Sequence, residues 1–195
     1  MSGHVSSNPV RLPSASQEPT RRRLTDRQAD TVQKLVDAVV VEVRQQGYDG
    51  TTVRGVARRA GVASATAYTY FASKDHLFAE VWWRRLRALP RAADAAATIR
   101  DICLLVADEP ELSAACTTAM LAGDPDVAHL RLRVGGEIRA RLTEALGPKA
   151  SDTAVHALEF ALSGALLQAG MGHLDYADLA TELGDVAALV LRARR

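Results

Sequence analysis

Cysteine is scarce in this chain of 195 residues, and the two present, Cys103 and Cys116, do not form a CxxC pair. The spacing therefore gives no sign of a redox motif or of a thiolate metal site. Because cytosolic thiols stay reduced, we expect both to be free thiols on apolar helices.

Long apolar runs are missing as well. Nowhere do eighteen apolar residues follow one another, so we expect no transmembrane helix and no membrane partner. Residues 1–23 lack the apolar central segment of a signal peptide, which favours a cytoplasmic protein. The 48% hydrophobic and 24% charged residues are typical of a folded chain, long enough for one large or two small domains.

Motifs of catalysis are also absent. The sequence contains no GxSxG, P-loop or dinucleotide-binding glycine pattern. His129, His156 and His173 lie on different predicted helices without HExxH spacing, and the single pair of His156 with Glu159 is more typical of a surface contact. We therefore expect neither enzymatic activity nor a bound metal or cofactor.

Net charge is only +1, but it is unevenly distributed along the chain. Residues 20–87 hold 13 Lys and Arg against 7 Asp and Glu, whereas residues 88–195 hold 10 against 15. A basic first third joined to an acidic remainder suggests a polyanionic partner for the first part alone. Charge runs are also common on solvated faces, so this asymmetry needs support from motifs.

Residues 1–20 are rich in serine and proline without apolar periodicity, so we expect residues 1–23 to form a disordered arm. Three arginines, at positions 21–23, end this arm. They can follow the phosphates of a nucleic acid or form a solvated linker, and whether the arm contacts DNA stays open.

Every periodic segment after the arm is helical. The first helix carries one apolar stripe and ends at Gly47; the stripe consists of Val32, Leu35, Val36, Val39, Val40 and Val43. No segment alternates as a strand does, so the predicted fold class is all-α. Beyond Pro90, helices are expected at about 92–107, 110–122, 126–146, 151–171 and 175–193.

Two short helices follow the first one. Thr51 or Thr52 caps a second helix that Gly61 ends, and a third extends from about 64 to 71. Two short helices joined by a glycine turn and supported by a longer helix describe a helix-turn-helix. The second short helix of that motif enters the DNA major groove, which here places Ala63, Ser64, Ala65 and Thr66 at the bases.

The residue types in this region identify a family more specifically than the predicted arrangement of its helices does. Four segments occur in order: Thr51-Thr52, 56-VARRAGV-62, Tyr68-Thr69-Tyr70-Phe71 and Ser73-Lys74. Together they resemble the DNA-binding domain of the tetracycline-repressor (TetR) family of bacterial transcription regulators, over about residues 27–80. The resemblance implies a helix-turn-helix domain at 24–72 and a helical effector-binding and dimerisation domain at 73–195, whose first helix, 73–89, connects the two.

The resemblance also implies individual DNA contacts. Thr52 would offer its hydroxyl and backbone N–H to a phosphate, Tyr68 would reach the DNA backbone, and Lys74 would pair with phosphate. Thr51, Arg54 and Tyr70 are further candidates, although Arg54 is as often solvated and Tyr70 partly packs into the domain. Where many members have Lys-Gly, this chain has Ser64-Ala65, so the operator sequence cannot be read from the motif.

The resemblance further implies a homodimer on a near-palindromic operator, usually a repressor that a small molecule releases. Segments 151–171 and 175–193 carry small and apolar residues suited to a four-helix dimer interface, or to an intramolecular core. A cavity between residues 82 and 167 would be mostly aliphatic, which favours a flexible apolar effector. Its candidate residues are Trp82, Ile102, Cys103, Leu105, Cys116, Met120, Leu121, Leu162 and Leu166. An activator without an effector, or a helical interaction module, is the alternative.

Overall fold

Helices account for all regular structure in the computed structural model, which describes residues 26–148 and 150–192. Within these ranges the fold is all-α, as predicted, and the predicted arm at residues 1–23 lies outside them. The helices are α1 (Asp26–Gly50), α2 (Val53–Arg59), α3 (Ser64–Tyr70), α4 (Lys74–Ala88), α5 (Ala95–Ala107), α6 (Pro110–Met120), α7 (Pro125–Leu146), α8 (Asp152–Gly170) and α9 (Leu179–Arg192).

The apolar stripe of α1 forms one side of the core. Its members Val32, Leu35, Val39 and Val43 are all fully buried. Gly47 has φ 67°, a left-handed conformation that glycine adopts without strain, and the regular helix ends there as predicted. One further turn carries the chain to Gly50 and to the start of the helix-turn-helix.

Local side chains cap several helix starts. Thr52 Oγ1 accepts a hydrogen bond from the Gly55 amide, and Ser73 Oγ accepts one from the His76 amide. The predicted cap of α2 is thereby confirmed as Thr52, and Ser73 caps α4 in the same way. Asp94 caps α5 by accepting from the Ala97 amide, a signal that our prediction of a start at 92 missed. The start of α9, predicted at 175, is four residues later because a turn at 175–178 precedes it.

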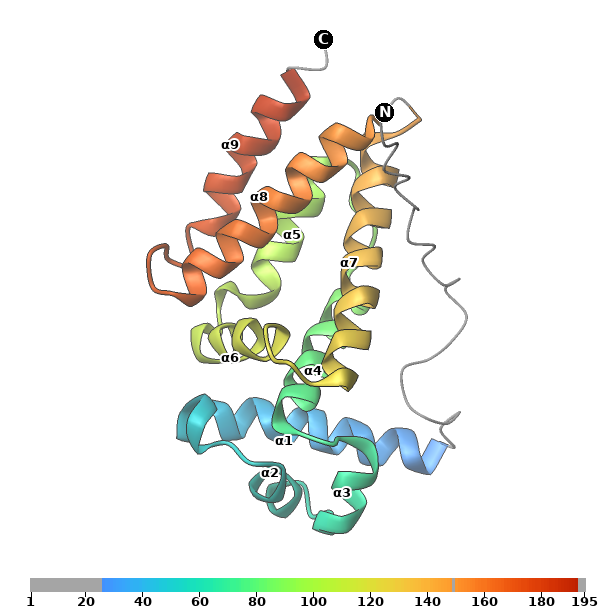
Figure 1. The fold of residues 1–195 in the computed structure, drawn as a ribbon, viewed down its shortest axis with the longest axis vertical. Coiled ribbons are helices and arrows are strands. Elements are labelled where there is room, and N and C mark those ends of the chain that lie inside the picture. The colour runs from blue at the N-terminus through green and yellow to red at the C-terminus, as the bar shows by residue number, and fades with distance from the viewer. Residues whose placement is uncertain (1–25, 149, 193–195) are drawn as a thin grey trace, which may run out of the picture.

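The helices form two groups that share α4 (Figure 1). Helices α1, α2 and α3 lie together at one end of the molecule, with α1 between the two short helices and the rest. From there α4 extends into the second group, where it packs against α6 and α7, while α5 packs against α9. Phe78, Trp82 and Leu86 of α4 are buried in the resulting core.

Arg141 on α7 is buried and holds the end of α4. Its guanidinium donates hydrogen bonds to the carbonyl oxygens of Leu86, Leu89 and Pro90, at 2.9 to 3.0 Å, and to Glu137 at 2.8 Å. The last carbonyls of a helix lack the amides that the next turn would supply, and here one side chain bonds the Leu86 carbonyl and two carbonyls directly after α4. The ion pair with Glu137 offsets the cost of burying the charge.

Replacement of Arg141 by methionine is expected to destabilise the fold by about 3 kcal/mol, because the part-buried Glu137 and the carbonyls at the end of α4 lose the hydrogen bonds of this buried guanidinium. The free energy of unfolding from urea denaturation measures the effect. Arg100→Met, a change at an exposed arginine of α5, serves as the matched control and should change stability by about 0.5 kcal/mol or less. Equal stability of the two variants would contradict this role of Arg141.

Candidate nucleic-acid interface and apolar pocket

A glycine turn sets the angle between α2 and α3. Gly61 has φ 66°, and the Val62 amide then donates to the Ala57 carbonyl, which closes the turn. Ala67 of α3 is fully buried and Phe71 just after it is 2% exposed, so this side of α3 faces the core. The opposite side of α3 is therefore presented outward at the end of the molecule.

Close contact with α1 fixes the position of α2. A Cβ added at Gly55 would lie 2.8 Å from Oε1 of Glu42, a buried carboxylate of α1. Arg59 of α2 pairs with the same carboxylate at 2.6 Å and also donates to Gln45. The absence of a side chain at residue 55 therefore allows α2 to approach α1 closely enough for this ion pair.

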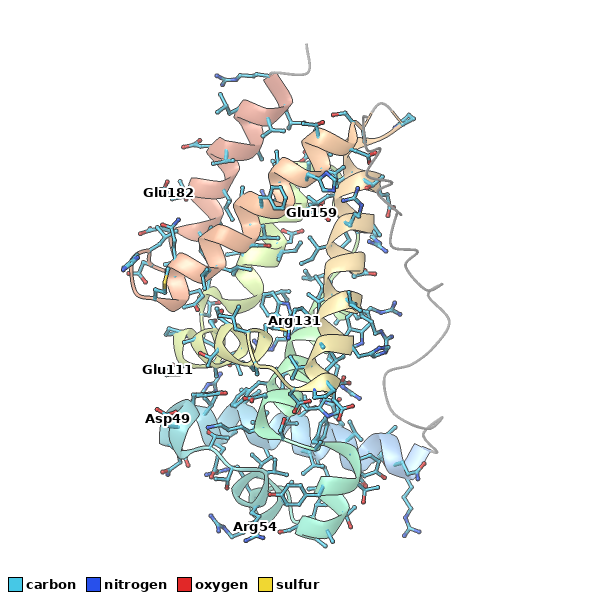
Figure 2. The ribbon with its side chains drawn as sticks, viewed as in Figure 1. Asp49, Arg54, Glu111, Arg131, Glu159 and Glu182 are labelled. Atoms are coloured by element: carbon cyan, nitrogen blue, oxygen red, sulfur yellow. The ribbon has the colours of Figure 1, made fainter. Side chains whose placement is uncertain are left out.

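The structure gathers most of the predicted DNA-contacting residues on one outer face. Tyr68 is 46% exposed, Tyr70 is half-buried against the core, and the remaining members are exposed: Thr52, Arg54, Ala63, Ser64, Ala65 and Thr66. Arg54 lies at the α2 end of the molecule (Figure 2). Within the described part of the chain, Arg54 and Arg58 make no ion pair, whereas Arg59 does.

Thr51 does not lie on this face, and its prediction as a DNA contact needs correction. Its side chain is 0% exposed, and its hydroxyl donates to the Gly47 carbonyl at 2.7 Å. A hydroxyl held there closes the last turn of α1 and does not reach the surface. The adjacent Thr52 is exposed. Thr51 therefore packs inside the domain, and only Thr52 lies at the surface.

Lys74, the first residue of α4, is engaged within the protein. Its Nζ donates to the Tyr48 carbonyl at 2.8 Å and lies 4.0 Å from the centre of the Tyr48 ring. The Tyr48 hydroxyl in turn donates to Asp75, and burial together with this carboxylate raises the pKa of Tyr48. Lys74 thus fastens the start of α4 to α1, and any phosphate contact would be additional to this task.

A second feature is an apolar pocket of about 330 Å³ between α4, α6, α7 and α8. Trp82, Cys116, Met120, Leu121 and Leu166 line it, as the sequence suggested. Four other candidates do not line it: Ile102, Cys103, Leu105 and Leu162. Helix α5 packs against α9, which turns Ile102 and Cys103 into the core, and the buried Leu162 lies on the inner side of α8.

Sequence reasoning missed the polar lining of this pocket. Arg131, Ser113, Thr117 and Ser163 come from helix faces that apolar periodicity does not single out, and Tyr176 arrives through the turn before α9. Burial raises the pKa of Tyr176, and burial raises the pKa of Cys116 to about 12. Both groups are therefore uncharged at neutral pH.

One hydrogen bond joins the start of α4 to the start of α7. Ser73 Oγ, the cap of α4, donates to Asp124 Oδ2 at 2.6 Å, while Asp124 Oδ1 accepts from the Asp126 amide as the cap of α7. Burial would raise the pKa of Asp124, but the hydrogen bonds from Ser73 and from backbone amides outweigh it and lower that pKa. Residues 121–124, which follow α6, are thus tied to the residue that begins α4.

Comparison with known proteins identifies the group to which this arrangement belongs. The family model described as bacterial regulatory proteins, tetR family, matches residues 35–81. Over 175 residues the chain is 46% identical to an HTH-type transcriptional regulator of Mycobacterium tuberculosis, which covers 85% of this chain and 82% of the relative. The chain belongs to the TetR family. It is therefore a DNA-binding transcriptional regulator with a helix-turn-helix, and not an enzyme.

Solved structures of TetR-family proteins share the fold. A TetR regulator from Rhodococcus sp. RHA1 aligns with a TM-score of 0.69 at 21% identity, covering 86% of this chain and 98% of the other. FadR of Bacillus subtilis, solved in complex with stearoyl-CoA, aligns with a TM-score of 0.55 at 16% identity, covering 80% and 96%. No described helix of this TetR-family chain is long and apolar enough to cross a membrane.

Replacing Arg54 by glutamine is expected to flatten the slope of log K against log salt by roughly 0.9 for each subunit on the DNA, because each subunit loses one phosphate contact and its released counterion. Filter binding to DNA fragments selected from genomic DNA, at several salt concentrations, measures the slope. The exposed Arg100 of α5 lies outside the face, so Arg100→Gln should leave affinity and slope unchanged. An Arg54→Gln slope equal to wild type would remove Arg54 from the interface.

Tyr68→Phe is expected to behave differently, since a hydroxyl carries no charge. Loss of its hydrogen bond to the DNA backbone should weaken binding about fivefold at every salt concentration, with the slope unchanged. The same fragments and titrations measure both effects. Undiminished affinity would show that Tyr68 is exposed without touching DNA.

Proposed function

We propose that this TetR-family regulator is a cytoplasmic repressor that binds a near-palindromic operator as a homodimer and is released by a small apolar effector. The pocket is the observation that carries the proposal, because α4, the helix that follows α3 in the chain, contributes Trp82 to its wall. FadR of Bacillus subtilis, which has a similar fold, holds stearoyl-CoA and supports an apolar effector. Residues 24–72 would bind DNA, and residues 73–195 would bind the effector and form the dimer.

Footprinting on selected genomic fragments tests the DNA half of the proposal. A homodimer with two-fold symmetry should protect two half-sites that form an inverted repeat. Their centres should be about one turn of the DNA helix apart, or a multiple of it. A reporter promoter next to the operator should be more active when the regulator gene is deleted. A single asymmetric footprint, or lower reporter activity after deletion, would overturn the dimeric repressor.

An apolar surface on α8 and α9 supports the homodimer. These two helices pack against each other and lie at one side of the molecule (Figure 1). Phe160 is 73% exposed and Leu189 is 67% exposed, and Leu167, Met171 and Val186 are exposed as well. Single exposed apolar residues are ordinary, but four on these two helices and a fifth, Met171, directly after α8 indicate a protein contact.

Leu189→Glu is expected to weaken the dimer on the order of a hundredfold, because a two-fold interface brings both new charges into the contact. Sedimentation equilibrium measures the dissociation constant, and operator affinity should fall with it. Leu132 of α7 is similarly exposed but lies outside α8 and α9, so Leu132→Glu is the matched control and should leave the dimer intact. A Leu189→Glu protein as dimeric as the control would contradict this interface.

Gly135→Leu is expected to fill the pocket, since residue 135 lines it and an added Cβ meets no atom within 4 Å. Binding of the dye anilinonaphthalene sulfonate, which has apolar rings and one anionic sulfonate, should weaken by about tenfold or more, as followed by fluorescence. Gly136→Leu adds the same side chain beside the pocket, where an added Cβ also meets no atom, and should leave the dye affinity unchanged. Equal loss in both variants would place the dye elsewhere.

A further inference from the structure

One charged side chain distinguishes the apolar pocket. Of the described residues that line it, Arg131 alone carries a charge at neutral pH, because Cys116 and Tyr176 stay protonated. No carboxylate lines the pocket, so an organic cation would meet a like charge without a counterion. An anion would meet the opposite charge at the edge of an apolar cavity.

Arg131 is placed to meet a ligand at the rim of the pocket. It extends from α7 toward α6 (Figure 2), where its Nη2 donates to the Ala122 carbonyl at 2.8 Å. A guanidinium has five N–H donors in a planar fork that matches a carboxylate, and one of them suffices for Ala122. Its side chain is exposed, so a polar head group bound there keeps contact with water while a tail enters the cavity.

The apolar walls define the rest of the ligand. Val134 and Ile138 follow Arg131 on α7, and Met120, Leu166 and Leu167 face them from α6 and α8. A volume of about 330 Å³ lies at the small end of ligand pockets, which limits the tail to a modest size. The hydroxyls of Ser113, Thr117 and Ser163 also line the pocket and can hydrogen-bond to a few polar atoms along the tail.

We propose that the pocket takes an apolar molecule with a single carboxylate, bound by Arg131 at the rim with its tail along α6, α7 and α8. This rests on the proposed function, in which the same pocket receives the effector. A carboxylate that takes both Nη groups of the guanidinium draws Nη2, which donates to the Ala122 carbonyl, away from that carbonyl. The head group therefore acts on residues 121–124 as well as on affinity.

The next contacts carry this change toward the DNA-binding helices. Ala122 is two residues before Asp124, whose carboxylate accepts from Ser73 at 2.6 Å. Ser73 caps α4 and stands three residues after the last residue of α3. Release of Ala122 by Arg131 thus loosens a short segment whose other end holds the start of α4.

Three probes with the same tail and different head groups test the ligand class: decanoate, decanol and decyltrimethylammonium. Isothermal titration calorimetry on the full-length chain should show decanoate binding about fivefold more tightly than decanol, the factor expected for a charge pair in contact with water. The cation should bind more weakly than decanol. Arg131→Gln should bring decanoate to the affinity of decanol and leave decanol unchanged, whereas the exposed control Arg100→Gln should match wild type.

Binding of decanol as tight as decanoate, no binding of any probe, or an Arg131→Gln protein that still prefers decanoate would each overturn the proposed ligand. Release from selected DNA tests the second step. Saturating decanoate should release the wild type but not Arg131→Gln, and release of that variant at saturation would overturn the route through Arg131. A wild type that binds decanoate by calorimetry yet binds no DNA would instead overturn the repressor, leaving the ligand class supported.

Discussion

The hydrogen bond between Ser73 and Asp124 joins the start of α4, the helix that both groups share, to the start of α7. Ser73 Oγ accepts from an amide of α4 as its cap and donates to Asp124 Oδ2. Asp124 uses its other oxygen, Oδ1, to cap α7. A helix cap contributes about 1 kcal/mol, so a displacement of residues 121–124 weakens both helix starts by amounts of this size. A ligand shifts such a link only by the difference between its affinities for the two arrangements, and a tenfold difference, about 1.4 kcal/mol, already equals the contribution of one cap.

Helix α4 is held by polar contacts at both ends and by apolar packing in between. At its start, Lys74 and Asp75 engage Tyr48 of α1, and at its end the buried Arg141 of α7 binds the last carbonyls. Trp82, near the middle, is buried and also borders the apolar pocket. A ligand in the pocket therefore contacts α4 near its middle, at Trp82. The polar contacts at the two ends of α4 limit how the helix can move in response.

Local signals made much of this fold predictable. Gly47 and Gly61 have the positive φ angles that end a helix and make a turn, and Thr52 and Ser73 cap the helices that follow them. The apolar stripe of α1 is buried as its spacing indicated. In each case the residue acts on backbone groups within a few positions of itself. Both partners of the interaction therefore lie in one short segment, where a sequence pattern can show them.

The parts that failed depend on partners far along the chain. Ile102 and Cys103 have the apolar spacing of pocket residues, but the packing of α5 on α9 decides that they face the core. The contact of Lys74 with Tyr48 spans 26 positions, and for the same reason the motif did not reveal it. Arg131 and Tyr176 were overlooked because a search for an apolar cavity has no reason to include charged or hydroxylated side chains.

The outer face of α3 places a physical limit on how this regulator can recognise bases. Ser64, Ala65 and Thr66 are exposed and small, and serine or threonine hydroxyls bond to more than one base. No arginine, lysine, asparagine or glutamine, the side chains that make bidentate contacts with guanine or adenine, lies within α3. Small side chains do allow the helix backbone to approach the groove floor closely. Selectivity would then depend on groove shape and on the spacing of two half-sites, with Arg54 and Arg58 setting the register through phosphates.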